Sequence, residues 1–169
     1  MFSSDRFDRQ SILILDTGPI RELVTYHAVY HFGFSKLRQE LKQLTSVENY
    51  QNFSEFLATF RKKMTSTSVI AELHWWIRET DHHGQIRLWT RVREEFERMG
   101  MDEDAVTLLA MDIELLAKLG PTDVSLLEIA RRNVRQHPVI LTVDGQLQME
   151  CRKAQVFSRS LSEACMGVI

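Results

Sequence analysis

The segment formed by residues 12–20 constrains the fold more than any other part of the chain. It opens with an aliphatic run, Ile12–Leu15, and a continuous apolar run this short is typical of a strand buried on both faces in a parallel sheet. The run ends at Asp16, after which residues 17–19 (Thr-Gly-Pro) predict a turn into a helix. We therefore expect Asp16 at the carboxyl end of a buried strand, where open α/β sheets bind ligands. Taken alone, the segment is explained equally well by Asp16 capping the helix.

The rest of the chain alternates short apolar runs with amphipathic helical patterns. Residues 139–143 repeat the opening pattern, an aliphatic run followed by an acid, Asp144. Strands are predicted at residues 12–15, 64–67, 105–110, 139–143 and 156–157. This alternation predicts an α/β fold of three layers, in which helices flank a central, mostly parallel sheet of four to five short strands. The predicted organisation is a leader at residues 1–11, a single domain at 12–160 with a helical insertion at about 35–63, and a tail at 161–169.

The middle of the chain predicts two consecutive helices. Ser68 is predicted to cap a helix over residues 69–79, which carries the pair Trp75 and Trp76. Such a pair is more typical of core and edge packing than of a base-stacking platform. Residues 82–84 (His-His-Gly) predict a loop before a second helix over residues 85–99, whose arginines form a charged outer face.

Composition narrows the class of protein and its partners. The net charge of −2 excludes a polycation, so any nucleic acid must be bound through local basic patches. Cys151 and Cys165 stand without a CxxC motif, which favours free thiols over a disulfide or a zinc site. His27 and His31 lie on a packing stripe without an acidic third ligand, so packing is favoured over metal binding. The polar N-terminal residues do not resemble a signal peptide and no apolar run approaches membrane-spanning length, so we expect a cytoplasmic protein without a membrane partner.

Acidic residues stand out by their context at four positions: Asp16, Glu72, Asp123 and Asp144. Asp16 and Asp144 follow aliphatic strands, and they share one edge of the sheet if those strands are parallel neighbours. Glu72 and Asp123 lie near helix starts that can face the same edge, although a solvated helix position explains Glu72 and helix-dipole stabilisation explains Asp123. Carboxylates gathered in one cleft repel one another and their pKa values rise unless a cation neutralises them. Oxygen ligands of this kind suit Mg²⁺ or Mn²⁺, which can activate water for phosphodiester hydrolysis.

Three other α/β enzyme classes fit the sequence less well. The chain has no GxxxxGK[ST] motif, which excludes a P-loop, and no GxGxxG after the first strand, which excludes the dinucleotide fingerprint. A phosphatase of the DxD type requires an acid at position 18, where this chain has Gly18.

The four acids occur in stretches that resemble the motifs of the PIN-domain family, which includes VapC-like toxin ribonucleases. In order, the stretches are residues 15–19 (Leu-Asp-Thr-Gly-Pro), 68–73 (Ser-Val-Ile-Ala-Glu-Leu), 122–127 (Thr-Asp-Val-Ser-Leu-Leu) and 141–144 (Leu-Thr-Val-Asp). The resemblance covers roughly residues 12–157. It implies a metal-dependent endoribonuclease in which Asp16, Glu72, Asp123 and Asp144 bind Mg²⁺ or Mn²⁺ and catalyse hydrolysis. It also implies that Thr142 orients water or ligand.

The chain departs from the family's toxin members in its length, because of the helical insertion at about residues 35–63. The resemblance makes RNA the expected substrate and an antitoxin protein a candidate partner if the chain is a toxin. A homodimer is a further candidate, although intramolecular packing explains the added helices equally well. The alternative function is a catalytically idle PIN module that binds RNA or a protein partner.

Overall fold

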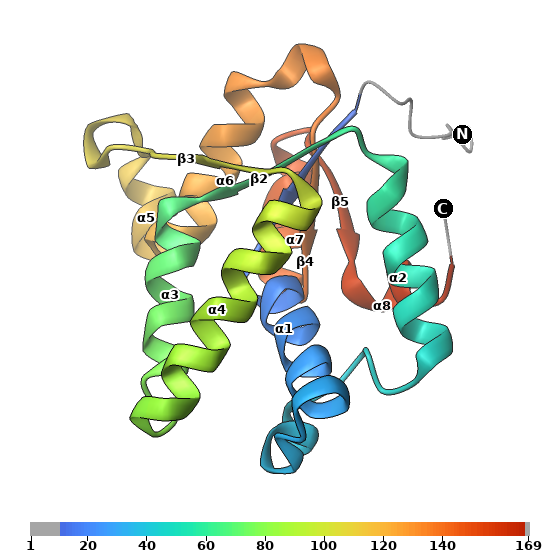
Figure 1. Cartoon of the computed structure of the whole chain (residues 1–169). Coiled ribbons are helices and arrows are strands. Elements are labelled where there is room, and N and C mark those ends of the chain that lie inside the picture. Colours follow the sequence, from blue (N-terminus) through green and yellow to red (C-terminus); the bar gives the residue numbers. More distant parts are fainter. Residues whose placement is uncertain (1–10, 168–169) are drawn as a thin grey trace.

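Figure 1 shows the chain as a computed structural model, in which residues 11–167 are described. The predicted leader, residues 1–11, lies outside this part except for its last residue. The strands are β1 (Ile12–Leu15), β2 (Lys62–Ser66), β3 (Met101–Asp104), β4 (Val139–Thr142) and β5 (Phe157–Ser160). The α-helices are α1 (Thr17–Phe32), α2 (Val47–Thr59), α3 (Thr67–Ile77), α4 (His82–Met99), α5 (Ile113–Leu119), α6 (Pro121–Arg132), α7 (Gly145–Lys153) and α8 (Leu161–Cys165). Short 3₁₀ helices are η1 (Ser35–Glu40), η2 (Leu108–Ala110) and η3 (Val134–Gln136).

The strands form one five-stranded sheet in the order β3-β2-β1-β4-β5, and every neighbouring pair is parallel. This arrangement confirms the predicted α/β class and the mostly parallel sheet. In the central register, Ile14 lies opposite Met64 of β2 on one side and Ile140 of β4 on the other. The strand order reverses between β1 and β4, and the crevice at such a switch point is where open α/β sheets bind ligands.

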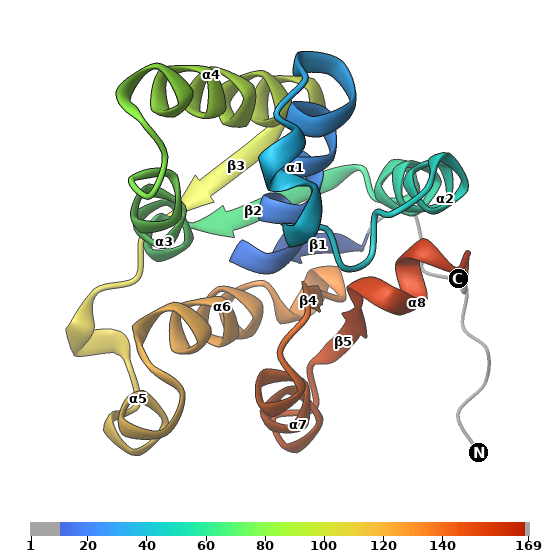
Figure 2. The same cartoon turned by 90° about the horizontal axis from the view of Figure 1, so that it is seen from below.

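Helices cover both faces of the sheet. Figure 2 shows α1 and α4 on one face and α6 and α7 on the other. The two central strands, β1 and β4, are buried along their whole length, which explains why their sequences are continuous aliphatic runs. Cys151 and Cys165 belong to the same core as free, buried thiols, as predicted, and burial raises the pKa of each to about 12.

The segment at about residues 35–63 contains η1 and α2 and is fastened to α1 by one buried carboxylate. Glu22 of α1 accepts hydrogen bonds from the backbone N–H groups of Lys42 (2.7 Å), Gln43 (3.2 Å) and Leu44 (3.1 Å). Those N–H groups lie between η1 and α2. Glu22 therefore holds the connection between η1 and α2 against α1.

The predicted tail is part of the packed domain up to Cys165, which corrects the sequence interpretation of residues 161–169. Residues 161–165 form α8, in which Leu161 and Ala164 are buried, and α8 packs against α2. A complete capping box of Ser160 and Glu163 begins this helix. Residues 168 and 169 lie outside the described part.

The third strand is not where the sequence predicts it. Residues 105–110 form no strand: apart from the partly buried Val106 they are exposed, and Leu109, in the middle of a short 3₁₀ turn, is 99% accessible. The strand is instead Met101–Asp104, an acidic edge segment that pairs with β2 alone. Its pairing is supported by ion pairs from Lys62 to Asp102 and from Arg132 to Asp104, neither of which a hydrophobic pattern can reveal.

Smaller differences concern helix starts. Ser66, rather than Ser68, caps α3 by accepting a hydrogen bond from the Ser68 N–H group (3.0 Å). The predicted loop at residues 82–84 is the first turn of α4, which Asp81 caps through the Gly84 N–H group (2.7 Å). Within residues 11–167, none of the helices combines the length and apolar character needed to cross a membrane.

Candidate active site

Asp16 lies at the switch point and is held in one orientation. It follows β1, is 6% exposed, and its backbone N–H group donates to the carbonyl of Leu141 in β4 (3.1 Å). Its Oδ1 accepts from the backbone N–H group of Thr17 (2.6 Å), and its Oδ2 accepts from the hydroxyl of Thr142 (2.6 Å). Burial raises the pKa of Asp16 despite these two hydrogen bonds, and the negative charges of Glu72 and Asp144 raise it further.

Thr142 connects the acids that follow the two central strands. While its hydroxyl donates to Asp16, the same oxygen accepts from the backbone N–H group of Asp144 (2.9 Å). Asp144 is exposed and caps α7, since its Oδ1 accepts from the N–H groups of Gln146 (2.6 Å) and Leu147 (3.0 Å). Asp16 and Asp144 therefore both cap helices. Helix capping does not explain why the Asp16 side chain and the Asp144 backbone both bind the buried hydroxyl of Thr142.

Glu72 reaches this edge from α3. Its carboxylate is exposed, and its Oε2 accepts a hydrogen bond from the hydroxyl of Thr17 (2.6 Å). Because Thr17 follows Asp16 directly in the chain, this bond holds Glu72 beside the first acid. The sequence interpretation of Glu72 as a carboxylate at the border of an apolar helix face agrees with this position.

Asp123 is the fourth acid and the least supported by hydrogen bonds. It lies half-buried in the first turn of α6, and within residues 11–167 no donor or cation binds its carboxylate. Burial raises its pKa to about 7, and the charges of Asp16, Asp144 and Glu72 add to this effect. All four predicted acids are thus close enough to act on one another electrostatically.

Buried hydroxyls set α6 and its acid against the sheet. Ser125 of α6 donates to the Ser66 hydroxyl at the end of β2 (2.6 Å), and Thr65 donates to the carbonyl of Leu15 (2.8 Å). The sequence interpretation did not identify these groups or the bond from Thr17 to Glu72. Their one sequence signal is a run of hydroxyl residues, Thr65–Ser68, directly before the helix that carries an acid.

Gly18 has a steric role at the same edge. A Cβ atom at this position would lie 2.5 Å from Cγ2 of Val143, closer than real Cβ contacts come. The turns that follow β1 and β4 can therefore approach each other only because residue 18 has no side chain. This approach brings Asp16 and Asp144 to the same point of the sheet edge.

The oxygen atoms of the four acids suit a hard divalent cation, although their side chains are not arranged around a single ion position. In the part of the chain that the structure describes, no three acidic, histidine or cysteine side chains lie close enough together to hold a metal ion. Glu72 and Asp144 are engaged by Thr17 and by the first turn of α7, and both are exposed, so their side chains have room to rotate. Within residues 11–167 no lysine or arginine forms an ion pair with any of the four acids. Oxygen-only, net negative surroundings of this kind fit Mg²⁺ or Mn²⁺.

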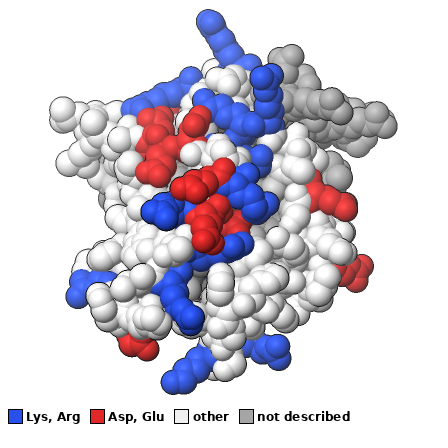
Figure 3. All heavy atoms as spheres, viewed as in Figure 1, with Lys and Arg blue, Asp and Glu red and all other residues white. Residues whose placement is uncertain are grey.

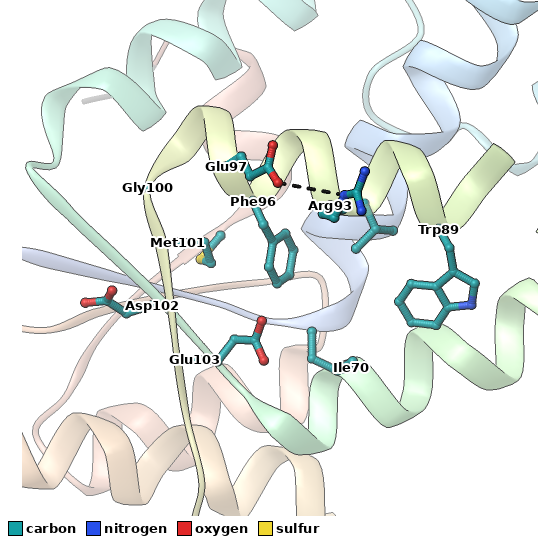
Figure 4. A pocket seen from close by; sticks show the side chains of 10 residues that line it. Ile70, Trp89, Arg93, Phe96, Glu97, Gly100, Met101, Asp102 and Glu103 are labelled. Atoms are coloured by element: carbon teal, nitrogen blue, oxygen red, sulfur yellow. Dashed lines mark ion pairs between the residues drawn. The ribbon is translucent and has the colours of Figure 1, made fainter. Parts of the chain in front are cut away.

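A hollow of about 500 Å³ lies elsewhere, between α3, α4 and β3 (Figure 4). Its walls include Ile70 and Phe96, and the ion pair of Arg93 with Glu97 lies at its rim. None of the four acids lines it. The face that carries α4 shows basic and acidic side chains interleaved rather than a continuous basic field (Figure 3).

A scan against protein-family models finds no match for this chain, and a search of curated proteins finds none either. The family resemblance therefore rests on the four sequence motifs.

Proposed function

We propose that this protein is a metal-dependent endoribonuclease of the PIN type, which hydrolyses RNA phosphodiester bonds at the carboxyl edge of its sheet. The observation that carries the proposal is that four acids, Asp16, Glu72, Asp123 and Asp144, lie around the switch point, and that among the described residues no lysine or arginine pairs with them. Burial first, and the other acids second, raise the pKa of Asp16 and of Asp123. Burial and repulsion of this kind cost stability when the carboxylates are ionised, and a bound cation would remove that cost.

Each side chain then has a distinct part in the site. Asp16 offers an oxygen whose direction Thr142 and the Thr17 N–H group determine, so it is the fixed ligand. Glu72, Asp123 and Asp144 would complete the carboxylate set for Mg²⁺ or Mn²⁺. When bound, such an ion lowers the pKa of a coordinated water and neutralises charge that develops on the scissile phosphate. Thr142 keeps Asp16 and Asp144 at a constant separation while substrate binds.

RNA is the proposed substrate because of the four motifs, which resemble those of ribonucleases. The same proposal includes two finer points, that the protein acts as a toxin with an antitoxin partner and that it forms a homodimer. The slightly acidic net charge of −2 requires that RNA be bound through a local surface.

The test is a ribonuclease assay on mixed RNA with and without Mn²⁺. We expect cleavage that requires the metal and that falls at least about 100-fold in Asp16→Asn and Asp123→Asn, since both remove a carboxylate from the ligand set. Asp112→Asn is the matched control, because Asp112 caps α5 away from the site and asparagine caps a helix equally well.

Two results would contradict the proposal. Cleavage that persists in a chelator would exclude metal-dependent catalysis. RNA binding in saturating Mn²⁺ without any cleavage would favour the idle module. Circular dichroism of each variant shows whether lost activity comes from the site or from misfolding.

A further inference from the structure

Helices α1 and α3 run side by side from the edge that carries the acids, and their contacts repeat at helical spacing. The first contact is the hydrogen bond from Thr17 to Glu72 (2.6 Å). One turn further, at i+4 on both helices, the guanidinium of Arg21 lies over the ring of Trp76, 5.1 Å from its centroid. Glu40 joins this second contact, accepting from Arg21 (2.6 Å) and from Nε1 of Trp76 (2.9 Å). The row that begins at the acids thus continues along α3.

The two neighbouring tryptophans of α3 have different surroundings. Trp76 is buried and hydrogen-bonded, so it has the packing role that the sequence predicts for the pair. Trp75 is 66% exposed, and within residues 11–167 its indole N–H group has no acceptor. An indole this exposed contributes little to the core, so packing does not account for a tryptophan at this position.

Trp75 lines a hollow of about 470 Å³ together with Arg21, Trp76, Arg78 and Glu79. The hollow begins one helical turn, about 5.4 Å, beyond the contact between Thr17 and Glu72. Arg21 also lines a second hollow, which reaches Gly18 and Val143 beside the acids. Arg21 is thus in the wall of both hollows, one of which contains Trp75 and the other Gly18 and Val143.

Arg78 supplies a positive charge that the protein does not neutralise. Its guanidinium lies over the ring of Trp75, 5.0 Å from the centroid, and among the described residues no carboxylate lies within ion-pair distance of it. Arg21, in contrast, is paired with Glu40. One face of the Trp75 ring carries the unpaired guanidinium while the side chain stays largely exposed, which matches a nucleotide whose base stacks on the other face and whose phosphate binds the cation.

We propose that Trp75 and Arg78 form a stacking subsite for one unpaired base of the RNA, about one helical turn from the bond that is cleaved. The inference rests on the proposed ribonuclease function and adds a binding group to it. Bases in a duplex are already stacked on each other, so the subsite selects single-stranded segments.

The experiment measures RNA binding in the Asp16→Asn background, so that bound RNA stays intact. The probes are an oligouridylate of about ten nucleotides and its duplex with oligoadenylate, both in Mn²⁺. We expect Trp75→Ala to weaken binding of the single strand about tenfold, since that is typical of losing one stacked base, and to leave duplex binding nearly unchanged. Trp75→Phe keeps an aromatic face and retains most of the affinity, while Arg78→Gln weakens binding and lowers its salt dependence.

A second readout is independent of affinity. The chain has three tryptophans, and RNA that stacks on Trp75 quenches its fluorescence, so quenching should disappear in Trp75→Phe. Phe32→Ala is the control, because Phe32 is a half-exposed aromatic residue at the opposite end of α1 from Thr17.

The outcomes separate the two proposals. Unchanged binding by Trp75→Ala, or an equal loss in Phe32→Ala, would overturn the stacking subsite even if the wild-type protein cleaves RNA. If the wild type cleaves no RNA and Asp16→Asn binds none, the ribonuclease proposal fails and the subsite fails with it.

Discussion

Two regions of the molecule bury carboxylates, and they compensate the charge in opposite ways. In the interface of α1 and α4, Glu95 is fully buried and binds Arg91 and, at 2.7 Å, Arg98. At the carboxyl edge of the sheet, Asp16 is almost as deeply buried, but its charged neighbours are other acids. Glu95 is compensated by arginines and the equally structural Glu22 by three backbone N–H groups, so each of these buried acids has strong donors. Among the described residues no lysine or arginine pairs with the acids at the sheet edge, and we propose that a bound cation supplies the compensating charge.

His27 belongs to the compensated region but does not contribute charge. Its Nε2 lies 3.4 Å from Oε1 of Glu95, yet its pKa is lowered to about 3, first by burial and then by the charges of Arg91, His31 and Arg98. The ring is therefore neutral near pH 7, and its contact with Glu95 is not an ion pair. Its stacking on His31, with centroids 5.0 Å apart, agrees with the packing role predicted from the sequence.

The largest effect on stability is expected when the buried carboxylate of Glu95, which pairs with arginines, is neutralised. Glu95→Gln leaves Arg98 without its anion and Arg91 with only the more exposed Glu94, and we expect the free energy of unfolding to fall by about 3 kcal/mol, as is typical of breaking a buried ion pair. Urea denaturation measures it. The control is Glu97→Gln, which breaks an exposed pair with Arg93 and should cost less than about 0.5 kcal/mol. Equal small losses in both variants would mean that the α1–α4 interface does not depend on its charges.

An increase in stability of similar size is expected when a divalent cation is added to the acids at the sheet edge. Mg²⁺ or Mn²⁺ at 100 times its Kd should stabilise the protein by about 2.7 kcal/mol through binding to the folded state alone. That corresponds to an increase in Tm of several degrees, measured by differential scanning calorimetry. The shift should shrink in Asp16→Asn and persist in Asp112→Asn. An equal shift in wild type and Asp16→Asn would place the cation elsewhere on the protein.

The smallest effect concerns the charge of Asp123 in the absence of metal. The pKa of Asp123 is about 7 in the folded protein against an ordinary value of 3.8, so the unfolded chain loses this proton first as pH rises. Its contribution to stability therefore falls between about pH 4 and pH 7 and then stays low. At pH 8 we expect Asp123→Asn to be more stable than wild type by about 1 kcal/mol, because solvent screens a half-buried group.

The difference between the two proteins should be much smaller at pH 4, where Asp123 is protonated in the folded protein and close to half protonated in the unfolded chain. Thermal unfolding at both pH values in a chelator provides the measurement. A variant that is less stable than wild type at pH 8 would show that Asp123 is structurally required rather than electrostatically strained.

The sequence predicts the positions of the acidic residues better than it predicts the hydrogen bonds that orient their side chains. Asp16 and Asp144 are identifiable because each ends an aliphatic run, a local pattern that reflects burial in the sheet centre. The bonds of Thr142 to Asp16 and of Thr17 to Glu72 join residues far apart in the chain, so their partners depend on the strand order. The hydrogen bonds from the N–H groups of Lys42, Gln43 and Leu44 to Glu22 cannot be predicted from the sequence either. The donors are backbone groups, which every residue except proline has, so no side-chain pattern marks them.

Strand β3 illustrates a consequence of how sheets end. Its residues Asp102, Glu103 and Asp104 give it almost no hydrophobic signal, which is why sequence reasoning placed the strand elsewhere. As an edge strand, β3 offers one row of backbone hydrogen-bonding groups without a partner strand, and exposed edges of this kind invite pairing between molecules. Another copy that approached this edge would bring like charges together. The acidic residues that conceal the strand from pattern analysis thus also protect the folded protein against edge-to-edge aggregation.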